Sequence, residues 1–192
     1  MNYKGLNINK ETTLFLDRDG VINKLLPNDY VKSIDEFCFI DGVLDCFVDL
    51  SKLFGKVIIV TNQQGIGKGI MTLEDLEEVH NYLASKVFEF EGRIDQIYFC
   101  PSLASENDPN RKPEIGMALQ AKKDFPAIDF KNSIMLGDSQ SDMDFGNNAG
   151  MKTVLITNEI RSKVQNADAQ ANTLKDFINE LIENRDAKFN FI

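Results

Sequence analysis

The sequence has no tryptophan, one histidine, three cysteines and five prolines among its 192 residues. Cys38, Cys46 and Cys100 are too few and too scattered for a disulfide framework or a paired zinc knuckle, so we interpret them as packing residues in a reducing compartment. With His80 as the single histidine, no Ser-His-Asp or Cys-His catalytic group can be identified. His80 lies inside a helical pattern, and we interpret it as a surface or packing residue.

Long apolar runs and excess positive charge are also absent. No run approaches the length needed to span a bilayer, and the polar residues 1–11 lack an apolar signal core, so we expect a cytoplasmic location. The 21 Lys+Arg against 30 Asp+Glu leave a net charge of −9. Because phosphate backbones are held chiefly by Lys and Arg, we expect no nucleic-acid and no membrane partner.

Short apolar runs alternate with helical patterns along the chain. Strands are predicted over residues 12–16, 57–60, 94–99, 134–136 and 153–156. Helices are predicted over residues 42–54, 73–90, 114–125, 142–149 and 174–184. This alternation predicts an α/β fold, a doubly wound parallel sheet with helices on both faces. We expect a single domain over residues 1–192, with a motif-bearing core at 12–157.

Polar motifs follow three of the predicted strands. They are DRDGVIN at 17–23, TNQQGIGKG at 61–69 and GDSQSDM at 137–143, and RKP at 111–113 precedes a predicted helix. The carboxyl ends of parallel strands share one edge of the sheet, so acids, hydrogen-bond donors and cations should converge there. GIGKG is not a nucleotide loop, because a Walker A loop would need Gly at Asn62 and Ser or Thr at Gly69.

In this order, the four motifs resemble those of the haloacid-dehalogenase-like (HAD) phosphohydrolases over residues 12–157. Together with FIDGV at 39–43, YFCP at 98–101 and RKPEIGM at 111–117, they are most similar to the D-glycero-D-manno-heptose-1,7-bisphosphate 7-phosphatases and the related histidinol-phosphate phosphatases. The resemblance implies a HAD-like Rossmannoid fold and a phosphoric monoester hydrolase. The segments between the motifs are too short for a separate cap domain.

The resemblance also implies a role for each acid. Asp17 would attack phosphorus and form an aspartyl-phosphate, and Asp19 would act first as general acid and then as general base. Mg²⁺ would be held by Asp17, the main-chain carbonyl of Asp19 and Asp138, with Asp142 bracing this site from behind. Two unit like charges ~4 Å apart repel by ~4 kcal/mol at an effective dielectric near ~20, so attack on a phosphate requires such a cation.

The remaining implied residues contact the substrate. Thr61 and Lys112 would stabilise the phosphoryl group. A planar guanidinium at Arg111 could hold a second phosphate through two hydrogen bonds, as a bisphosphate sugar would require. The implied substrate-binding residues are Asn62, Gln63, Gln64, Arg111 and Tyr30.

The sequence departs from the family in its zinc loop, which usually contains one Cys, a His and two further Cys. Here only Cys100 is present, and Ser102 replaces the His. One cysteine cannot form a tetrahedral site, so we expect no zinc. Ser139 also replaces a lysine found in some relatives, which removes one phosphate contact.

We therefore expect a Mg²⁺-dependent phosphatase, a monomer or small homo-oligomer, acting on a small phosphorylated sugar. The first choice is heptose 1,7-bisphosphate, cleaved to the 1-phosphate, a step in the synthesis of lipopolysaccharide precursors. Histidinol phosphate is the nearest alternative substrate. The net charge disfavours a polynucleotide 3′-phosphate, and Asp19 disfavours a phospho-acceptor signalling module, because hydrolysis needs that second carboxylate whereas a lasting signal does not. A sugar-phosphate-binding protein without activity is the remaining alternative.

Overall fold

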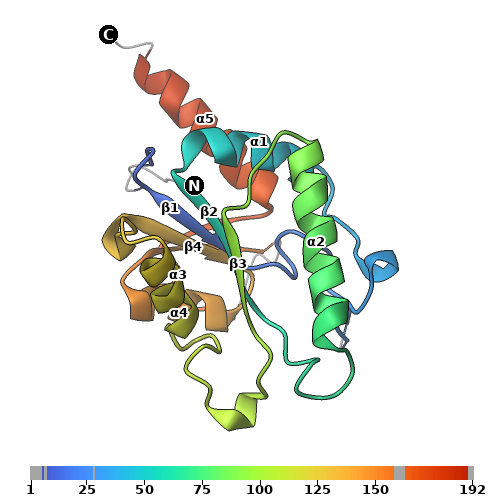
Figure 1. Cartoon of the computed structure of the whole chain (residues 1–192). Helices are drawn as coiled ribbons and strands as arrows, with labels where there is room; N and C mark the ends of the chain where they lie inside the picture. The colour runs from blue at the N-terminus through green and yellow to red at the C-terminus, as the bar shows by residue number, and fades with distance from the viewer. Residues whose placement is uncertain (1–5, 7, 28, 158–162, 190–192) are drawn as a thin grey trace.

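The computed structural model describes residues 6, 8–27, 29–157 and 163–189, with residues 184–189 described by their main chain only. A six-stranded sheet lies between two layers of helices (Figure 1). All strand pairs are parallel, in the order β3-β2-β1-β4-β5-β6. The strands are β1 (Thr13–Leu16), β2 (Lys56–Asn62), β3 (Gln96–Cys100), β4 (Ser133–Gly137), β5 (Lys152–Ile156) and β6 (Ala169–Ala171).

Helices cover both faces of the sheet, which confirms the predicted doubly wound α/β fold. On one face lie α1 (Val43–Leu53), α2 (Leu73–Glu89) and α5 (Leu174–Phe189). On the other lie α3 (Gly116–Asp124) and α4 (Gln140–Ala149). The 3-10 helices are Ile34–Glu36, Ala104–Glu106 and Phe130–Asn132.

The central strands are apolar over their middle residues because both of their faces are buried. In β1, Leu14 and Leu16 pack towards α1, α2 and α5, whereas Phe15 packs towards α3 and α4. Neighbouring strands repeat this alternation, since Ile59 belongs to the first cluster and Ile58 to the second. Continuous apolar runs in the sequence therefore correspond to the middle of the sheet.

Element boundaries differ from the predicted ones where side chains or pairing decide them. Helix α4 begins at Gln140, ahead of the predicted residue 142, because Ser139 and Asp142 form a capping box. Strand β6 was not predicted, since Ala-Gln-Ala has no strand pattern and forms by pairing with β5. Within the described chain, the long connections contain only short 3-10 helices and no cap domain. None of the described helices is long and apolar enough to cross a membrane.

Candidate active site

The candidate site lies at the carboxyl ends of β1, β2 and β4. Asp17 follows β1, and its main-chain N–H donates to the Leu136 carbonyl of β4 at 2.9 Å. Asp138 follows β4, and Thr61 lies near the end of β2. Because β1 is placed between β2 and β4, where successive connections leave in opposite directions, residues far apart in the chain meet at this edge of the sheet.

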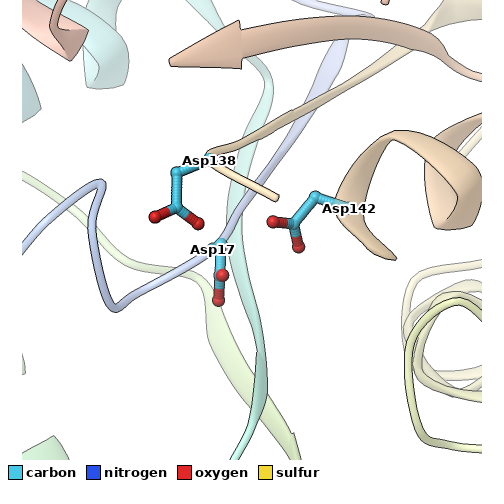
Figure 2. A group of neighbouring side chains, drawn as sticks. All are labelled: Asp17, Asp138 and Asp142. Carbon is cyan, nitrogen blue, oxygen red and sulfur yellow. The ribbon is translucent and has the colours of Figure 1, made fainter. Parts of the chain in front are cut away.

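Three aspartates form a compact acidic cluster here. Asp17, Asp138 and Asp142 each place a carboxylate oxygen within 4.8 Å of the others (Figure 2). Two glycines permit this approach. A Cβ on Gly20, whose φ is +84°, would lie 2.1 Å from Oδ2 of Asp138, and a Cβ on Gly137 would lie 2.3 Å from Cβ of Asp142. Any larger residue at either position would displace a member of the cluster.

Lys112 is the cation of the cluster. It is only 3% exposed, and its Nζ donates to Oδ1 of Asp17 at 2.9 Å, to Oδ1 of Asp142 at 2.6 Å and to the Val60 carbonyl at 2.8 Å. Burial lowers the pKa of Lys112, but the two carboxylates outweigh burial and hold the pKa above its ordinary value. The amide of Asn62 fixes the main chain of Lys112 through two hydrogen bonds of 3.0 Å each.

One ammonium does not balance three carboxylates. Burial and the charges of Asp142 and Asp138 raise the pKa of Asp17 to about 8, although Lys112 lowers it. Burial and Asp142 likewise raise the pKa of Asp138 to about 7. Without a divalent cation, both carboxyl groups therefore hold protons at a higher pH than an ordinary aspartate does.

The donor set fits Mg²⁺, which prefers hard oxygen ligands. Asp142 already accepts from Lys112 on Oδ1 and from the N–H and hydroxyl of Ser139 on Oδ2, at 3.0 and 2.6 Å. Asp138 forms no ion pair with any residue in the described part of the chain. Asp17 and Asp138 would therefore hold the cation, and Asp142 would support it through its charge and Lys112. The expected contribution of the Asp19 carbonyl remains a prediction.

Asp19 is held by three donors. Its Oδ1 accepts from Nη2 of Arg18 at 2.9 Å and from Nδ2 of Asn23 at 2.8 Å, and its Oδ2 accepts from Nε2 of Gln63 at 2.8 Å. Burial raises the pKa of Asp19, but Arg18 and the hydrogen bonds outweigh burial and lower the pKa below its ordinary value. The carboxylate is therefore ionised and fixed in orientation, while its side chain remains 25% exposed.

Each of these donors leaves one polar atom unpaired. Nε of Arg18, Oδ1 of Asn23 and Oε1 of Gln63 are buried without a hydrogen-bond partner among the described residues. An unpaired buried polar atom costs about 1–3 kcal/mol. The three residues that hold the Asp19 carboxylate in place therefore lower the stability of the fold through their unpaired atoms.

The polar residues at the end of β2 bond mainly within the protein. Thr61 is buried, and its hydroxyl accepts from Nε2 of Gln63 at 2.9 Å, which leaves the hydroxyl hydrogen for another acceptor. The substrate contacts expected at Asn62 and Gln63 remain predictions. Both carboxamides are already bonded within the protein, that of Asn62 to Lys112 and that of Gln63 to Asp19, and Gln63 is fully buried.

The other expected substrate-binding residues lie nearer the surface. Gln64, Tyr30 and Arg111 are half-buried. The hydroxyl of Tyr30 accepts from Nζ of Lys68 at 3.0 Å, and this Nζ lies 5.2 Å from the Tyr30 ring centroid. Nη1 of Arg111 donates to the Ser102 carbonyl at 3.1 Å. These side chains are the part of the site that a substrate can reach most easily.

The loop that replaces the family's zinc site is closed by hydrogen bonds. Ser102 donates to Asp108 at 2.5 Å, and Cys100 is buried at the end of β3. Within the described residues, the acidic cluster is the one group of His, Cys, Asp or Glu side chains suited to a metal. The absence of zinc stays a prediction. Cys46 is buried as expected, whereas Cys38 is exposed and is not a packing residue.

Two residues near Asp19 were not assigned to the active site from the sequence. Arg18 lies between Asp17 and Asp19 in the sequence, and a cation between two acids indicates that it offsets their negative charge. His80 is buried and contacts Arg18 through Nε2. Its place on the apolar face of α2, beside the buried Leu76 and Leu83, was the available signal for burial rather than surface exposure.

The chain is similar to curated phosphatases over most of its length. The D-glycero-alpha-D-manno-heptose-1,7-bisphosphate 7-phosphatase of Campylobacter jejuni is 39% identical over 171 residues, which cover 88% of this chain and 95% of that protein. The D-glycero-beta-D-manno-heptose-1,7-bisphosphate 7-phosphatase of Helicobacter pylori strain 26695 is 37% identical over 174 residues, covering 90% and 98%.

Solved structures share the fold. The D,D-heptose 1,7-bisphosphate phosphatase from B. bronchiseptica, crystallised with magnesium and phosphate, has a TM-score of 0.81 at 24% identity and covers 90% of this chain and 99% of that one. A HAD-like phosphatase from Mesorhizobium loti has a TM-score of 0.73 at 26% identity and covers 88% and 84%.

The HAD-hydrolase-like family model matches residues 109–182, which include Lys112, Asp138 and Asp142. This match and the curated relatives confirm the resemblance seen in the motifs. The chain belongs to the HAD-like hydrolases and, within them, to the heptose-1,7-bisphosphate phosphatase family.

Proposed function

We propose that this protein is a Mg²⁺-dependent phosphatase that converts D-glycero-D-manno-heptose 1,7-bisphosphate to the 1-phosphate. The observation that carries this proposal is that Asp19 and Lys112 lie beside the acidic cluster, which contains Asp17, at one edge of the sheet. The names of relatives at 39% and 37% identity support the substrate. Three free cysteines fit a cytoplasmic location, which is also a proposal.

In the first step, Asp17 attacks phosphorus. Its Oδ1 is held by the Arg18 N–H at 2.7 Å and by Lys112 at 2.9 Å, so the carboxylate is oriented before substrate arrives. As the bond from oxygen to phosphorus forms, the bond from phosphorus to the sugar oxygen breaks. Asp19 gives this oxygen a proton. Repulsion from the phosphate dianion raises the pKa of Asp19 and helps it to carry that proton.

In the second step, water attacks the phosphorus bound to Asp17. Asp19, now ionised, takes the proton of this water, and the bond between phosphorus and Asp17 breaks to release phosphate. Lys112 and the hydroxyl of Thr61 neutralise and orient the phosphoryl oxygens in both steps. When bound, Mg²⁺ supplies the positive charge that keeps Asp17 ionised and offsets the charge of the phosphate.

Lys68 and Arg111, two cationic side chains on adjoining loops, would bind the second phosphate of the substrate. The N–H of Gly67 donates to the Pro101 carbonyl at 3.1 Å, which joins the loop that carries Lys68 to the loop closed by Arg111. Neither Lys68 nor Arg111 is in an ion pair with another described residue. Both are therefore available to an anion, and a guanidinium can bind phosphate through two parallel hydrogen bonds.

Replacing Arg111 by Met tests this assignment. We expect KM for the bisphosphate to rise by about 10-fold or more, because a charged hydrogen bond contributes roughly 1.5–3 kcal/mol. A monophosphate that lacks the second group should be cleaved as by the wild type. An equal loss for both substrates would contradict a role in binding the second phosphate.

Mg²⁺ should stabilise the fold more at high pH. The pKa values of Asp17 and Asp138, about 8 and about 7 against an ordinary 3.8, mean that the cation-free folded chain holds protons that the unfolded chain releases. The contribution of these two groups to the free energy of unfolding therefore falls as the pH rises between about 4 and about 8. Because Mg²⁺ binds the ionised carboxylates, it should raise the melting temperature more at about pH 8 than at about pH 6. Thermal unfolding with and without Mg²⁺ measures this, and an equal shift at both pH values would contradict it.

Phosphate release measured with and without Mg²⁺ tests the function itself. The panel contains both anomers of the heptose bisphosphate, histidinol phosphate and an oligonucleotide 3′-phosphate, and NMR identifies which sugar phosphate is lost. We expect Mg²⁺-dependent loss of the 7-phosphate. A preference for histidinol phosphate or for the oligonucleotide would overturn the proposed substrate, and no release from any compound would overturn the proposed reaction.

A further inference from the structure

Behind Asp19 lies a cation that solvent does not reach. Arg18 is 0% exposed and heads the largest fully buried side chains. Its Nη2 donates to Asp19 at 2.9 Å, its Nη1 bonds to Nε2 of His80 at 3.2 Å, and its guanidinium carbon lies 5.9 Å from the ring centroid of Phe37. Its Nε has no hydrogen-bond partner among the described residues. A buried guanidinium with an unmade bond destabilises a fold, so stability alone does not account for it.

The contact with Arg18 determines the state of His80. A guanidinium can only donate, so Nε2 of His80 accepts and the imidazole is neutral with its hydrogen on Nδ1. Burial and the charge of Arg18 lower the pKa of His80 to about 3, which agrees with this tautomer. The ring is also held edge-on against Phe99, with centroids 5.9 Å apart. His80 is therefore a fixed acceptor on α2.

The imidazole also separates Arg18 from water. His80 lines a cavity of about 420 Å³ between α2 and the segment 94–97, and Arg18 is not part of its lining. On its other side, the guanidinium contacts Asp19, the acid of the DRDGVIN motif that does not belong to the acidic cluster. His80, Arg18 and Asp19 thus form one chain of contacts from helix α2 to the active site.

We propose that Arg18 and His80 are positioning residues that hold Asp19 in the orientation needed to protonate the leaving oxygen. The proposal rests on the proposed phosphatase function, in which neither residue touches the substrate. His80 accepts a hydrogen bond from Nη1 of Arg18, and this bond fixes the plane of the guanidinium. That plane directs Nη2 at Oδ1 of Asp19.

The leaving group distinguishes positioning from a general structural effect. A p-nitrophenolate ion departs without a proton, whereas an alkoxide needs one from Asp19. The ratio kcat/KM measures how far the transition state is stabilised relative to free enzyme and substrate. For this reaction it includes only the steps up to departure of the leaving group, and not the later hydrolysis of the aspartyl-phosphate. A misplaced Asp19 should therefore slow alkyl phosphates far more than p-nitrophenyl phosphate, whereas a damaged fold should slow both alike.

The experiment measures kcat/KM with Mg²⁺ for p-nitrophenyl, phenyl and alkyl phosphates and for the heptose bisphosphate. We expect His80→Phe, which removes the acceptor, to lower the alkyl and heptose values by about 10–100-fold and the p-nitrophenyl value by no more than about twofold, because full acid catalysis contributes about 10²–10⁴-fold. His80→Gln, whose amide oxygen can accept from Arg18, should restore most of the loss. In an Asp19→Asn background, His80→Phe should cause no further loss.

Leu83→Ala is the matched control, because Leu83 is buried one turn further along α2 and belongs to the core cluster. It should lower the melting temperature without changing the dependence on the leaving group. An equal effect of His80→Phe on all esters, no effect on any, or an additional loss in the Asp19→Asn background would each overturn the positioning role. If the wild type cleaves none of these esters, the proposed function fails and this inference fails with it.

Discussion

Replacing Asp17 by Asn should abolish phosphate release, with a loss of at least about 10⁴-fold in kcat, as is typical when an enzymatic nucleophile is removed. An amide oxygen is a poor nucleophile towards phosphorus and cannot form the aspartyl-phosphate on which both steps depend. The measurement is release of inorganic phosphate from the heptose bisphosphate with Mg²⁺. Retention of more than trace activity would contradict the covalent mechanism.

The same substitution should leave the fold intact. An Asn oxygen can still accept from Lys112 and from the Arg18 N–H, while the repulsion from Asp138 and Asp142 is removed. Without Mg²⁺, we therefore expect the melting temperature to equal or exceed that of the wild type. Asp45→Asn, at an exposed position of α1, is the matched control and should retain full activity. A strongly destabilised Asp17→Asn protein would show that the carboxylate is needed for folding.

Replacing Lys112 by Met should damage both stability and activity. Removing this ammonium leaves the carboxylates of Asp17 and Asp142 buried without a cation, and breaking a buried ion pair in this way typically costs about 3–5 kcal/mol. Loss of a charge that faces the phosphoryl group should also lower kcat by about 10²–10³-fold. Because Lys112 lowers the pKa of Asp17, its loss raises that pKa further and increases the Mg²⁺ concentration needed.

Chemical denaturation and phosphate release under folding conditions separate these two effects. Lys123→Met removes the same charge from an exposed position of α3 and should change the free energy of unfolding by no more than about 0.5 kcal/mol. Wild-type stability in Lys112→Met would show that the acidic cluster does not need its cation. Wild-type activity would show that Lys112 does not act on the phosphoryl group.

The fold was predictable because its pattern is local. Runs such as VIIV in β2 and LFL in β1 are apolar throughout, which is the signature of strands covered on both faces. Strand β6 lacked this signature because its position depends on pairing with β5 rather than on its own residues. The start of α4 depended on a side-chain bond between Ser139 and Asp142, which a hydrophobic pattern does not report.

Local sequence also indicated where the acids lie, since Asp17 and Asp138 directly follow β1 and β4, which are neighbours in the sheet, and Asp19 is two residues beyond Asp17. Side-chain partners could not be obtained in this way. Asn62 and Gln63 were expected to bind substrate, and the sequence did not indicate that their amides bond to Lys112 and Asp19. The direction of each amide depends on packing around β2, which residue type alone does not report.

Residue identity and strand pattern were sufficient for the α/β architecture, the HAD-like motifs and the expected nucleophile. The three-dimensional fold was needed to show that Arg18 is buried between Asp19 and His80, a residue 62 positions away, and that Lys112 reaches Asp142 across 30 positions. Such contacts join segments that approach only after the sheet has formed. No local pattern encodes them, because side-chain direction and burial are set by the packed neighbours rather than by the adjacent sequence.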